Sequence, residues 1–329
     1  MCLFTHNPLT EEYKMLPSRM TFNDLCAAYV RFKLLKPNTV LMYRASVKSW
    51  LNNSDIEYIH EVTEDAVIDW RNLRLRTVRR TTWNLHRRHL RALFNFAMHP
   101  KRRWVTSNPF KEVPPAPEPG RLPKTVAVPL LDQVMTLLTR HRGTSKGMAP
   151  RWFWGIVVRT FFFTGLRRSQ LPGIRWKDLH LNEKYLLLRY ETSKTLREWP
   201  VPLHDDLIQD LGYLEQQTRD VLGRAPLPDE QVFNGTLFNP RYEGSVLTPD
   251  HITRFFQDLT RELGTPISAH RLRHTMATQL APTGQLKSLQ DVLGHTNIKT
   301  TMGYIHPDVA QLGGLVSHLP SLRPIGRSC

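Results

Sequence analysis

The sequence predicts a mainly α-helical protein of two domains, with one small antiparallel sheet in the second domain. Apolar residues recur every three or four positions through most of its 329 residues, which is the spacing of amphipathic helices. A proline-rich stretch divides these helical segments into two groups. Between residues 177 and 203 the pattern changes to short apolar segments separated by turn residues, which indicates β-strands.

The first domain is predicted to be a bundle of four helices in residues 21–108, after an N-terminal extension of residues 1–20. Each helix is expected to begin at a side chain that can accept hydrogen bonds from the first turn. These capping residues are Thr21, Asn38, Thr63 and Thr81. Apolar side chains follow each cap at helical spacing and the connections are short, as in small helical bundles.

The proline-rich stretch runs from Pro109 to Pro129 and contains seven prolines. Proline fixes φ and removes a backbone donor, so this stretch is not expected to form a helix. It is interpreted as an extended linker, residues 109–129, between the two domains.

The second domain, residues 130–306, is expected to be mostly helical around its sheet. Its helices are predicted at 130–138, 152–163, 249–263, 270–280, 286–293 and 297–304. Its three strands are predicted at 177–181, 185–191 and 198–203. A further short helix is expected near 308–318, in a C-terminal segment of residues 307–329.

The charge of the chain favours a polyanionic partner. Its 45 Lys and Arg exceed its 29 Asp and Glu, which gives a net charge of +16. Residues 71–103 hold eleven of these basic residues and no acidic one, interleaved with aromatic residues. A solvated face is the alternative, but the length of the run favours a nucleic-acid surface. Its candidate residues are Arg76, Arg79, Arg80, Arg87, Arg88, Arg91, Lys101, Arg102 and Arg103.

Other partners are disfavoured by the sequence. The most apolar run, residues 155–163, is interrupted by Arg159 and is shorter than the roughly 20 residues of a membrane-spanning helix. No secretory signal is expected at the N-terminus. The three cysteines have no metal-binding spacing and fit a reducing cytoplasm. No phosphate-binding GxxxxGK[ST] loop is present, so no nucleotide cofactor is expected.

Six residues in the second domain have ordinary interpretations when each is taken alone. An arginine or lysine can be a solvated side chain, a histidine after Gly294 can follow a helix C-terminus, and a tyrosine can be a core aromatic. His270 and His274, four residues apart, could hold a metal, but no nearby Cys, Asp or Glu completes a site. Together the six form a set suited to surround a phosphodiester and attack it with a tyrosine. They are Arg167, Lys194, His270, Arg273, His295 and Tyr304.

Four segments, in order, resemble the tyrosine recombinase (phage integrase) family of site-specific DNA recombinases. They are TGLRRSQL at 164–171, SKTLREWPVPL at 193–203, HRLRHTMATQL at 270–280 and LGHTNIKTTMGYIH at 293–306. The resemblance spans roughly residues 125–310. It implies a catalytic domain of the DNA breaking-rejoining enzyme fold, and the N-terminal bundle resembles the family's core-binding (SAM-like) domain.

The resemblance also implies a role for each of the six residues. Tyr304 would attack the scissile phosphorus and form a 3′-phosphotyrosyl link. Arg167, Arg273 and His295 would bind the non-bridging oxygens. His270 would assist proton transfer at the tyrosine, and Lys194 would protonate the departing 5′-oxygen. No metal or other cofactor is then required, because cationic side chains stabilise the transition state.

Two positions depart from the family pattern. Gln170 stands where an acidic residue usually follows the first arginine. The hairpin after Lys194 lacks the usual glycine, and Thr195 to Trp199 keep one basic residue where the family has two. We expect the first change to orient Arg167 less strongly.

The family further implies double-stranded DNA as partner, a homotetramer on two DNA sites that exchanges strands through a Holliday junction, and an accessory directionality factor. Its C-terminal segment commonly docks on a neighbouring protomer, although packing of Val309, Leu312 and Leu315 on their own domain is the alternative. A type IB topoisomerase, a telomere resolvase and a catalytically silent DNA-binding protein remain rival interpretations. Integration or excision of a mobile element, inversion and dimer resolution all remain open as biological purposes.

Overall fold

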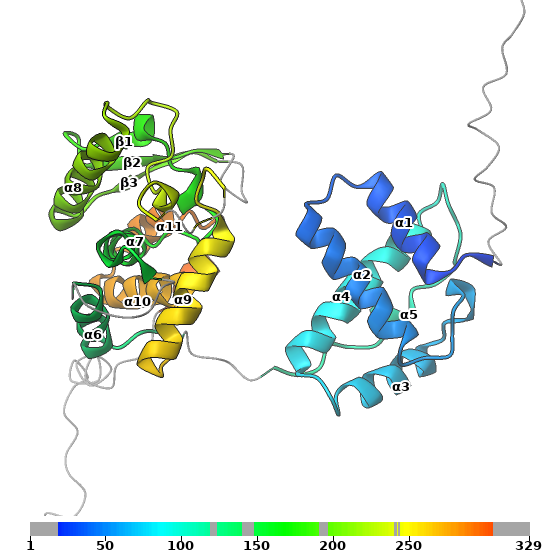
Figure 1. Ribbon diagram of the computed structural model, residues 1–329. Coiled ribbons are helices and arrows are strands. Elements are labelled where there is room, and N and C mark those ends of the chain that lie inside the picture. Colours follow the sequence, from blue (N-terminus) through cyan, green and yellow to red (C-terminus); the bar gives the residue numbers. More distant parts are fainter. Residues whose placement is uncertain are drawn as a thin grey trace, which may run out of the picture. The chain divides into compact units, whose positions relative to one another are not determined.

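The computed structural model describes residues 19–118, 124–139, 148–190, 197–239, 242 and 244–304. The chain forms two compact units, Met1–Arg121 and Leu122–Cys329, and each has its own hydrophobic core (Figure 1). The predicted combination of mainly helices with one small antiparallel sheet is confirmed. The last expected helix, near 308–318, lies outside the described residues.

The first unit is entirely helical in its described part. Its α-helices are α1 (Phe22–Phe32), α2 (Pro37–Leu51), α3 (Glu64–Arg74), α4 (Arg80–Ala97) and α5 (Pro109–Glu112). Thr21 and Thr63 cap α1 and α3 as expected. The other two expected caps are wrong. Helix α2 begins after Lys36 because Pro37 has a φ suited to a first helical position, and α4 begins after Arg79.

The start of the proline-rich stretch belongs to the core of this first unit. Pro109 opens the short helix α5, where a missing N–H costs nothing. Phe110 of this helix is fully buried, and its ring lies 5.2 Å from Trp50 and 5.0 Å from Phe94. Val113 and Ala116 are buried in the same core. The expectation that no helix forms in this stretch is therefore wrong at Pro109–Glu112, and again at its end, where a helix of the second unit begins at Val128.

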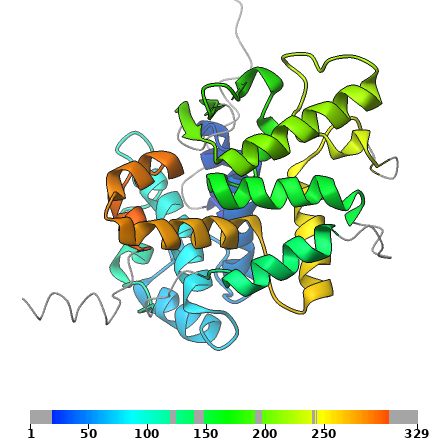
Figure 2. The same ribbon diagram turned by 90° about the vertical axis from the view of Figure 1, so that its left-hand side faces the viewer.

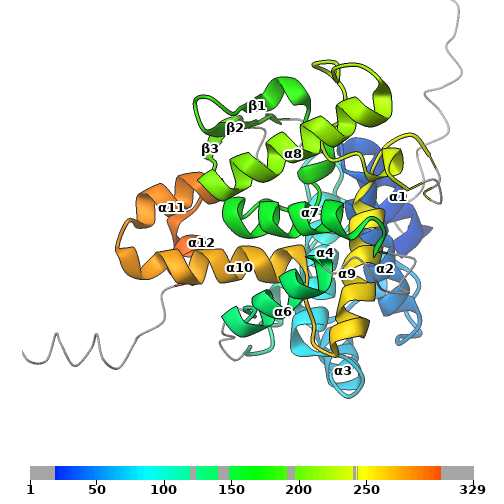
Figure 3. The same ribbon diagram turned by 60° about the vertical axis from the view of Figure 1, so that its left-hand side comes forward.

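The second unit is built around helix α7 (Arg151–Thr164), which lies between α8 (Asp205–Leu222) and α10 (Ala269–Leu280) (Figures 2 and 3). Most residues of α7 are buried, as expected of a central helix. The remaining α-helices are α6 (Val128–Thr139), α9 (Pro249–Leu263), α11 (Leu286–Leu293) and α12 (Ile298–Met302).

The sheet of the second unit has the strand order β1-β2-β3, with both pairs antiparallel. Its strands are β1 (Leu179–His180), β2 (Tyr185–Leu188) and β3 (Trp199–Pro202). Leu186 pairs with Val201, and both are buried in the core. The three predicted strands are present but shorter than expected.

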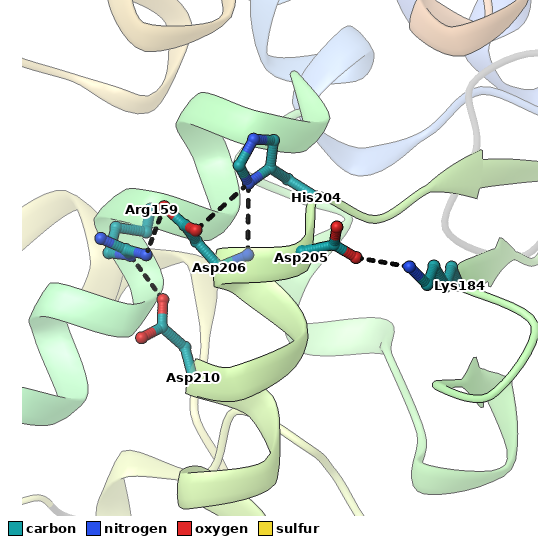
Figure 4. Close-up of polar contacts among 6 residues, drawn as sticks. All are labelled: Arg159, Lys184, His204, Asp205, Asp206 and Asp210. Atoms are coloured by element: carbon teal, nitrogen blue, oxygen red, sulfur yellow. Dashed lines mark hydrogen bonds and ion pairs between the residues drawn. The ribbon is translucent and has the colours of Figure 1, made fainter.

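Helix α8 is absent from the sequence-based prediction. Its buried residues Leu207, Leu211 and Leu214 follow helical spacing, but acidic and amide residues dominate the rest of its sequence. Polar side chains hold its N-terminus (Figure 4). Lys184 Nζ lies 2.7 Å from an Asp205 oxygen, and Nε of Arg159 donates to Asp210 over 2.5 Å.

Within the described residues, none of the helices combines the length and the apolar character needed to cross a membrane.

Candidate active site

Arg273 is the buried centre of the candidate site. It lies on α10, its side chain is 3% exposed, and Nη1 donates to Gly165 O over 2.6 Å while Nη2 donates to Leu293 O over 2.8 Å. Gly165 and Gly294 end α7 and α11, and both adopt the left-handed backbone conformation. One guanidinium therefore binds carbonyl groups at the negative ends of two helices, which favours a cation there.

Burial and the charge of Arg167 lower the pKa of Arg273 to about 10, whereas Tyr304 raises it. The group therefore keeps its charge at neutral pH. A guanidinium has five N–H donors, so Arg273 can be held by the fold and still donate to an anion.

His295 follows α11 and contacts Arg273 directly. Its Nε2 lies 2.8 Å from Nη2 of Arg273, and its Nδ1 lies 2.9 Å from the buried hydroxyl of Thr301. Burial, followed by the charges of Arg273 and Arg167, lowers the pKa of His295 to about 4. The imidazole is thus neutral at neutral pH.

Tyr304 lies in the same place. Its ring is 5% exposed and packs in a small cluster with Met276, Leu289 and Leu293. The ring is parallel to that of His295, with centroids 6.1 Å apart, and lies 5.3 Å from the ring of His274. The turn after α12 therefore brings the phenol beside the imidazole that contacts Arg273.

Arg167 lies in the loop after α7, and Gln170 fixes its backbone: the Arg167 N–H donates to Oε1 of Gln170 over 2.8 Å. Burial lowers the pKa of Arg167, while Tyr304 raises it. Nη1 of Arg167 is buried and has no hydrogen-bond partner among the described residues. A buried cationic donor without an acceptor lowers the stability of the fold. An anion bound at this atom would supply the missing acceptor.

His270 is an exposed residue one turn before His274 on α10, and the two Nε2 atoms are 2.8 Å apart. One imidazole therefore donates to the other. Although residue His270 as a whole is exposed, neighbouring atoms displace water around its ring, and this desolvation is the first cause that lowers its pKa; burial likewise lowers the pKa of His274, to about 4. Both imidazoles are therefore neutral at neutral pH.

Five of the six predicted residues thus share one electrostatic environment. Arg167 lowers the pKa of Arg273, His270 and His295. Tyr304 raises the pKa of both Arg167 and Arg273. Lys194 lies outside the described residues. No role for the hydroxyl of Thr301 is predicted from the sequence, and none for His274 beyond a rejected metal site, although His274 stands four residues after His270. Within the described ranges no group of three or more His, Cys, Asp or Glu could hold a metal.

The basic stretch of the first unit is exposed at most of its candidate positions. The exposed members are Arg76, Arg79, Arg80, Arg88, Arg91, Lys101 and Arg103. Arg102 is half-buried, with its guanidinium 3.6 Å from the ring centroid of Phe96. Arg87 differs from the prediction, because it is only 7% exposed and donates to Val113 O over 2.5 Å. It holds the segment after α5 and does not belong to the basic surface.

The sequence of this chain is similar to those of known recombinases. The sequence pattern described as "Phage integrase family" matches residues 124–311. The chain is 31% identical to proteins named "Putative tyrosine recombinase XerC" from Pseudomonas syringae and Pseudomonas aeruginosa. Each match covers 88% of this chain; it covers 62% of the P. syringae protein and 69% of the P. aeruginosa protein. The chain therefore spans less than two thirds of the first of these relatives.

Solved structures share the fold at low sequence identity. A Tn1549 transposon integrase in complex with transposon right end DNA has a TM-score of 0.65 and 18% identity, over 91% of this chain and 99% of that one. A lambda integrase dimer bound to a COC′ core site has a TM-score of 0.66 and 18% identity, over 91% of this chain and 81% of that one.

Proposed function

Because the chain belongs to the phage integrase family of tyrosine recombinases, we propose that it is a site-specific DNA recombinase that cleaves and rejoins DNA through Tyr304. One observation carries this proposal furthest. The buried Nη1 of Arg167 lacks an acceptor, and Arg273 and Tyr304 lie in the same electrostatic environment. A phosphodiester would supply the missing acceptor and place its phosphorus near a phenol.

In the proposed reaction, Oη of Tyr304 attacks the phosphorus and the bond from phosphorus to the 5′-oxygen breaks. The products are a 3′-phosphotyrosyl link and a 5′-hydroxyl. Negative charge grows on the non-bridging oxygens, and Arg167 and Arg273 stabilise it. Lys194 gives the leaving oxygen its proton, and the phenolic proton passes to His270. Rejoining is the reverse, with the 5′-hydroxyl of the partner strand as nucleophile.

The pair of His270 and His274 supports the proton transfer in this scheme. Both imidazoles are neutral at neutral pH, so His270 can accept a proton from the phenol. The hydrogen bond from one Nε2 to the other would then stabilise the new imidazolium.

Before it can contact the phosphate, His295 is expected to orient the guanidinium of Arg273. Both of its ring nitrogens already have partners, Arg273 and Thr301, so donation to the phosphate requires one of these hydrogen bonds to be exchanged. Until then the imidazole orients the guanidinium, and through it the phosphate.

Duplex DNA would also contact the basic surface of the first unit. Its exposed arginines and lysines neutralise phosphates, which makes binding dependent on salt. They position the DNA without reading its sequence. Together with the net charge of +16, this surface favours DNA over any uncharged partner. The three cysteines, an odd number, suggest no disulfide framework, which fits action in the reducing cytoplasm, on nucleoid DNA.

For assembly, we propose a homotetramer on two DNA sites that exchanges strands pairwise. The second unit carries an apolar groove of about 580 Å³, whose lining includes Phe162, Phe163, Leu203, Met276, Leu289 and Val292. The occupant proposed for this groove is the C-terminal segment, residues 307–329, of a second protomer. Val309, Leu312 and Leu315 give that segment an apolar stripe that matches the groove. An accessory protein would set the direction of recombination.

A nicked suicide substrate tests the catalytic proposal. The 5′-hydroxyl fragment diffuses away after cleavage, so the covalent protein–DNA adduct accumulates and survives denaturation. We expect the wild-type protein to form the adduct. We expect Tyr304→Phe to bind the DNA with the same affinity but to form no adduct. Absence of an adduct on a site that the protein binds specifically would identify a silent DNA-binding protein. Relaxation of supercoiled plasmid that lacks any specific site would identify a topoisomerase.

A single substitution tests the assembly proposal. Leu312→Asp places a charge in the apolar stripe, and we expect it to abolish recombination between two sites while one protomer still binds one site. Gln311→Asp, at the preceding position, is the control. Equal loss in both variants, or in neither, would contradict docking of the stripe.

A further inference from the structure

Trp199 connects the sheet to the turn that carries His295. It is the first residue of β3, and its indole Nε1 donates to Val292 O over 3.1 Å. Its ring lies directly against Gly294: a Cβ atom at that position would be 2.4 Å from Cζ2 of Trp199. Gly294 also has a φ of +60°, so both its conformation and its contact with the indole require glycine.

The C-terminus of α11 shows why this contact matters. The last four carbonyl groups of a helix have no partner within the helix. In α11 two of them are bonded by the following backbone, since the N–H of Gly294 donates to Asp291 O and the N–H of His295 donates to Gln290 O, each over 3.0 Å. This arrangement is a Schellman motif.

The other two carbonyl groups are bonded by side chains from distant parts of the chain. Trp199 donates to Val292 O, and Arg273 donates to Leu293 O. Arg273 then contacts Nε2 of His295, two residues further on. The turn of residues 292–295 is therefore fixed by Trp199 and by Arg273 together.

We propose that Trp199 is a positioning residue for the pair formed by Arg273 and His295. By holding Val292 O and covering Gly294, the indole sets the place of Leu293 O and of the His295 ring, which are two of the contacts that orient the Arg273 guanidinium. The inference rests on the proposed function, in which that guanidinium stabilises the transition state.

Trp199→Phe is the informative substitution, because it keeps an aromatic side chain in the core but removes both the N–H donor and the outer indole ring that touches Gly294. Trp176→Phe is the matched control. Trp176 is also half-buried and packs against the same core, but its Nε1 has no hydrogen-bond partner among the described residues.

Two measurements separate positioning from general structural damage. On the nicked suicide substrate we expect Trp199→Phe to slow single-turnover cleavage at least about five-fold, since small displacements of catalytic groups cost rate, while DNA affinity and melting temperature stay unchanged. Trp176→Phe should cleave at the wild-type rate. Wild-type cleavage by Trp199→Phe, or an equal loss in Trp176→Phe, would overturn the inference.

A substrate in which sulfur replaces the 5′-bridging oxygen at the scissile phosphate shows which catalytic groups Trp199 affects. A thiolate leaves without a proton, so this substrate restores defects in leaving-group protonation only. We expect no restoration in Trp199→Phe. Restoration would show that the indole acts on the hairpin before β3 and not on Arg273 and His295.

An NMR titration of His295 gives a readout that does not depend on activity. The ring contacts Arg273, and its pKa is lowered to about 4 by burial first, then by the charges of Arg273 and Arg167 and by the neighbouring His274. Loosening the turn should raise this pKa in Trp199→Phe and leave it unchanged in Trp176→Phe. An unchanged value in both would overturn the inference even if the wild-type protein formed no adduct, an outcome that would contradict only the proposed function.

Discussion

Nη2 of Arg273 donates to Nε2 of His295 over 2.8 Å, and this contact fixes the protonation state of the imidazole. A guanidinium can only donate, so Nε2 must be the unprotonated nitrogen. The ring proton is then on Nδ1, where it donates to Thr301 Oγ1. An imidazolium at His295 would break the contact with Arg273, which connects the state of this ring to pH.

The first prediction concerns stability in acid. The folded protein lowers the pKa of His295 to about 4, whereas the unfolded chain has the ordinary value of about 6.5. The unfolded state binds more protons between these values, so the free energy of unfolding rises with pH through this window. The stabilisation is complete above about pH 6.5 and is lost as pH falls toward 4.

His295→Gln keeps an acceptor for Arg273 and removes the titration. We expect the dependence of unfolding free energy on pH, measured by urea denaturation, to decrease by about 1–2 kcal/mol between pH 7 and 4.5, after allowance for partial exposure. His180→Gln, in the same unit but outside the site, is the control. An equal change in the control would argue against this origin.

The second prediction concerns the two carbonyl groups that Arg273 binds. Arg273→Lys cannot reach both Gly165 O and Leu293 O, so it leaves a buried acceptor without a partner. We expect a loss of about 1–3 kcal/mol of stability by urea denaturation and of about 10²–10³ in cleavage rate. Arg271→Lys, on the same helix but half-exposed, should be stable. A stable Arg273→Lys would contradict the structural part of this argument.

The third prediction compares one substitution at two buried glutamines. Gln170 accepts from the Arg167 N–H, but its own Nε2 is a buried donor with no partner in the described part of the chain. Gln170→Glu removes that donor and places a carboxylate near Arg167. We expect unchanged or higher stability and faster cleavage.

The same change at Gln231 should have the opposite effect. Its Nε2 donates to Pro172 O and Leu247 O, so Gln231→Glu loses two hydrogen bonds and turns an acceptor toward two carbonyl groups. We expect a loss of about 3 kcal/mol or more. Thermal denaturation of both variants distinguishes the two cases, and similar losses would show that Gln170 is fully paired.

The fourth prediction separates two neighbouring arginines of α4. Arg87 is buried against Val113 O, so Arg87→Ala should cost about 2 kcal/mol of stability and leave the salt dependence of DNA binding unchanged. Arg88 is exposed. Arg88→Ala should leave stability unchanged and reduce the slope of log affinity against log salt by about one. Binding titrations at several salt concentrations measure this, and a changed slope for Arg87→Ala would place that residue at the DNA.

The sequence predicts local features of this protein better than distant contacts. Thr21 and Thr63 are found as caps because a cap and its helix are adjacent in sequence. Helix α8 is missed because its polar residues mask three apolar ones at helical spacing. The α5 segment is missed because the rule against proline in helices does not apply at a first helical position.

The chemical set of the site is readable because the family motifs keep its residues in order. The contacts that position these residues cannot be predicted from the sequence in the same way. The contact of Arg273 with Gly165 joins residues 108 positions apart, and that of Trp199 with Val292 joins residues 93 apart. No local pattern of apolar or polar residues predicts such distant contacts. The burial of Arg87 likewise cannot be predicted from the arginine-rich stretch.

The end of α11 has a consequence for the life of the protein in a cell. Two of its terminal carbonyl groups, those of Val292 and Leu293, find their partners only when β3 and α10 have reached their final places, so the contacts that orient Arg273 and His295 form only with the tertiary structure. A nascent or partly denatured chain would hold the same residues without their alignment. Under the proposed function, such an incompletely folded chain would therefore cleave DNA slowly or not at all.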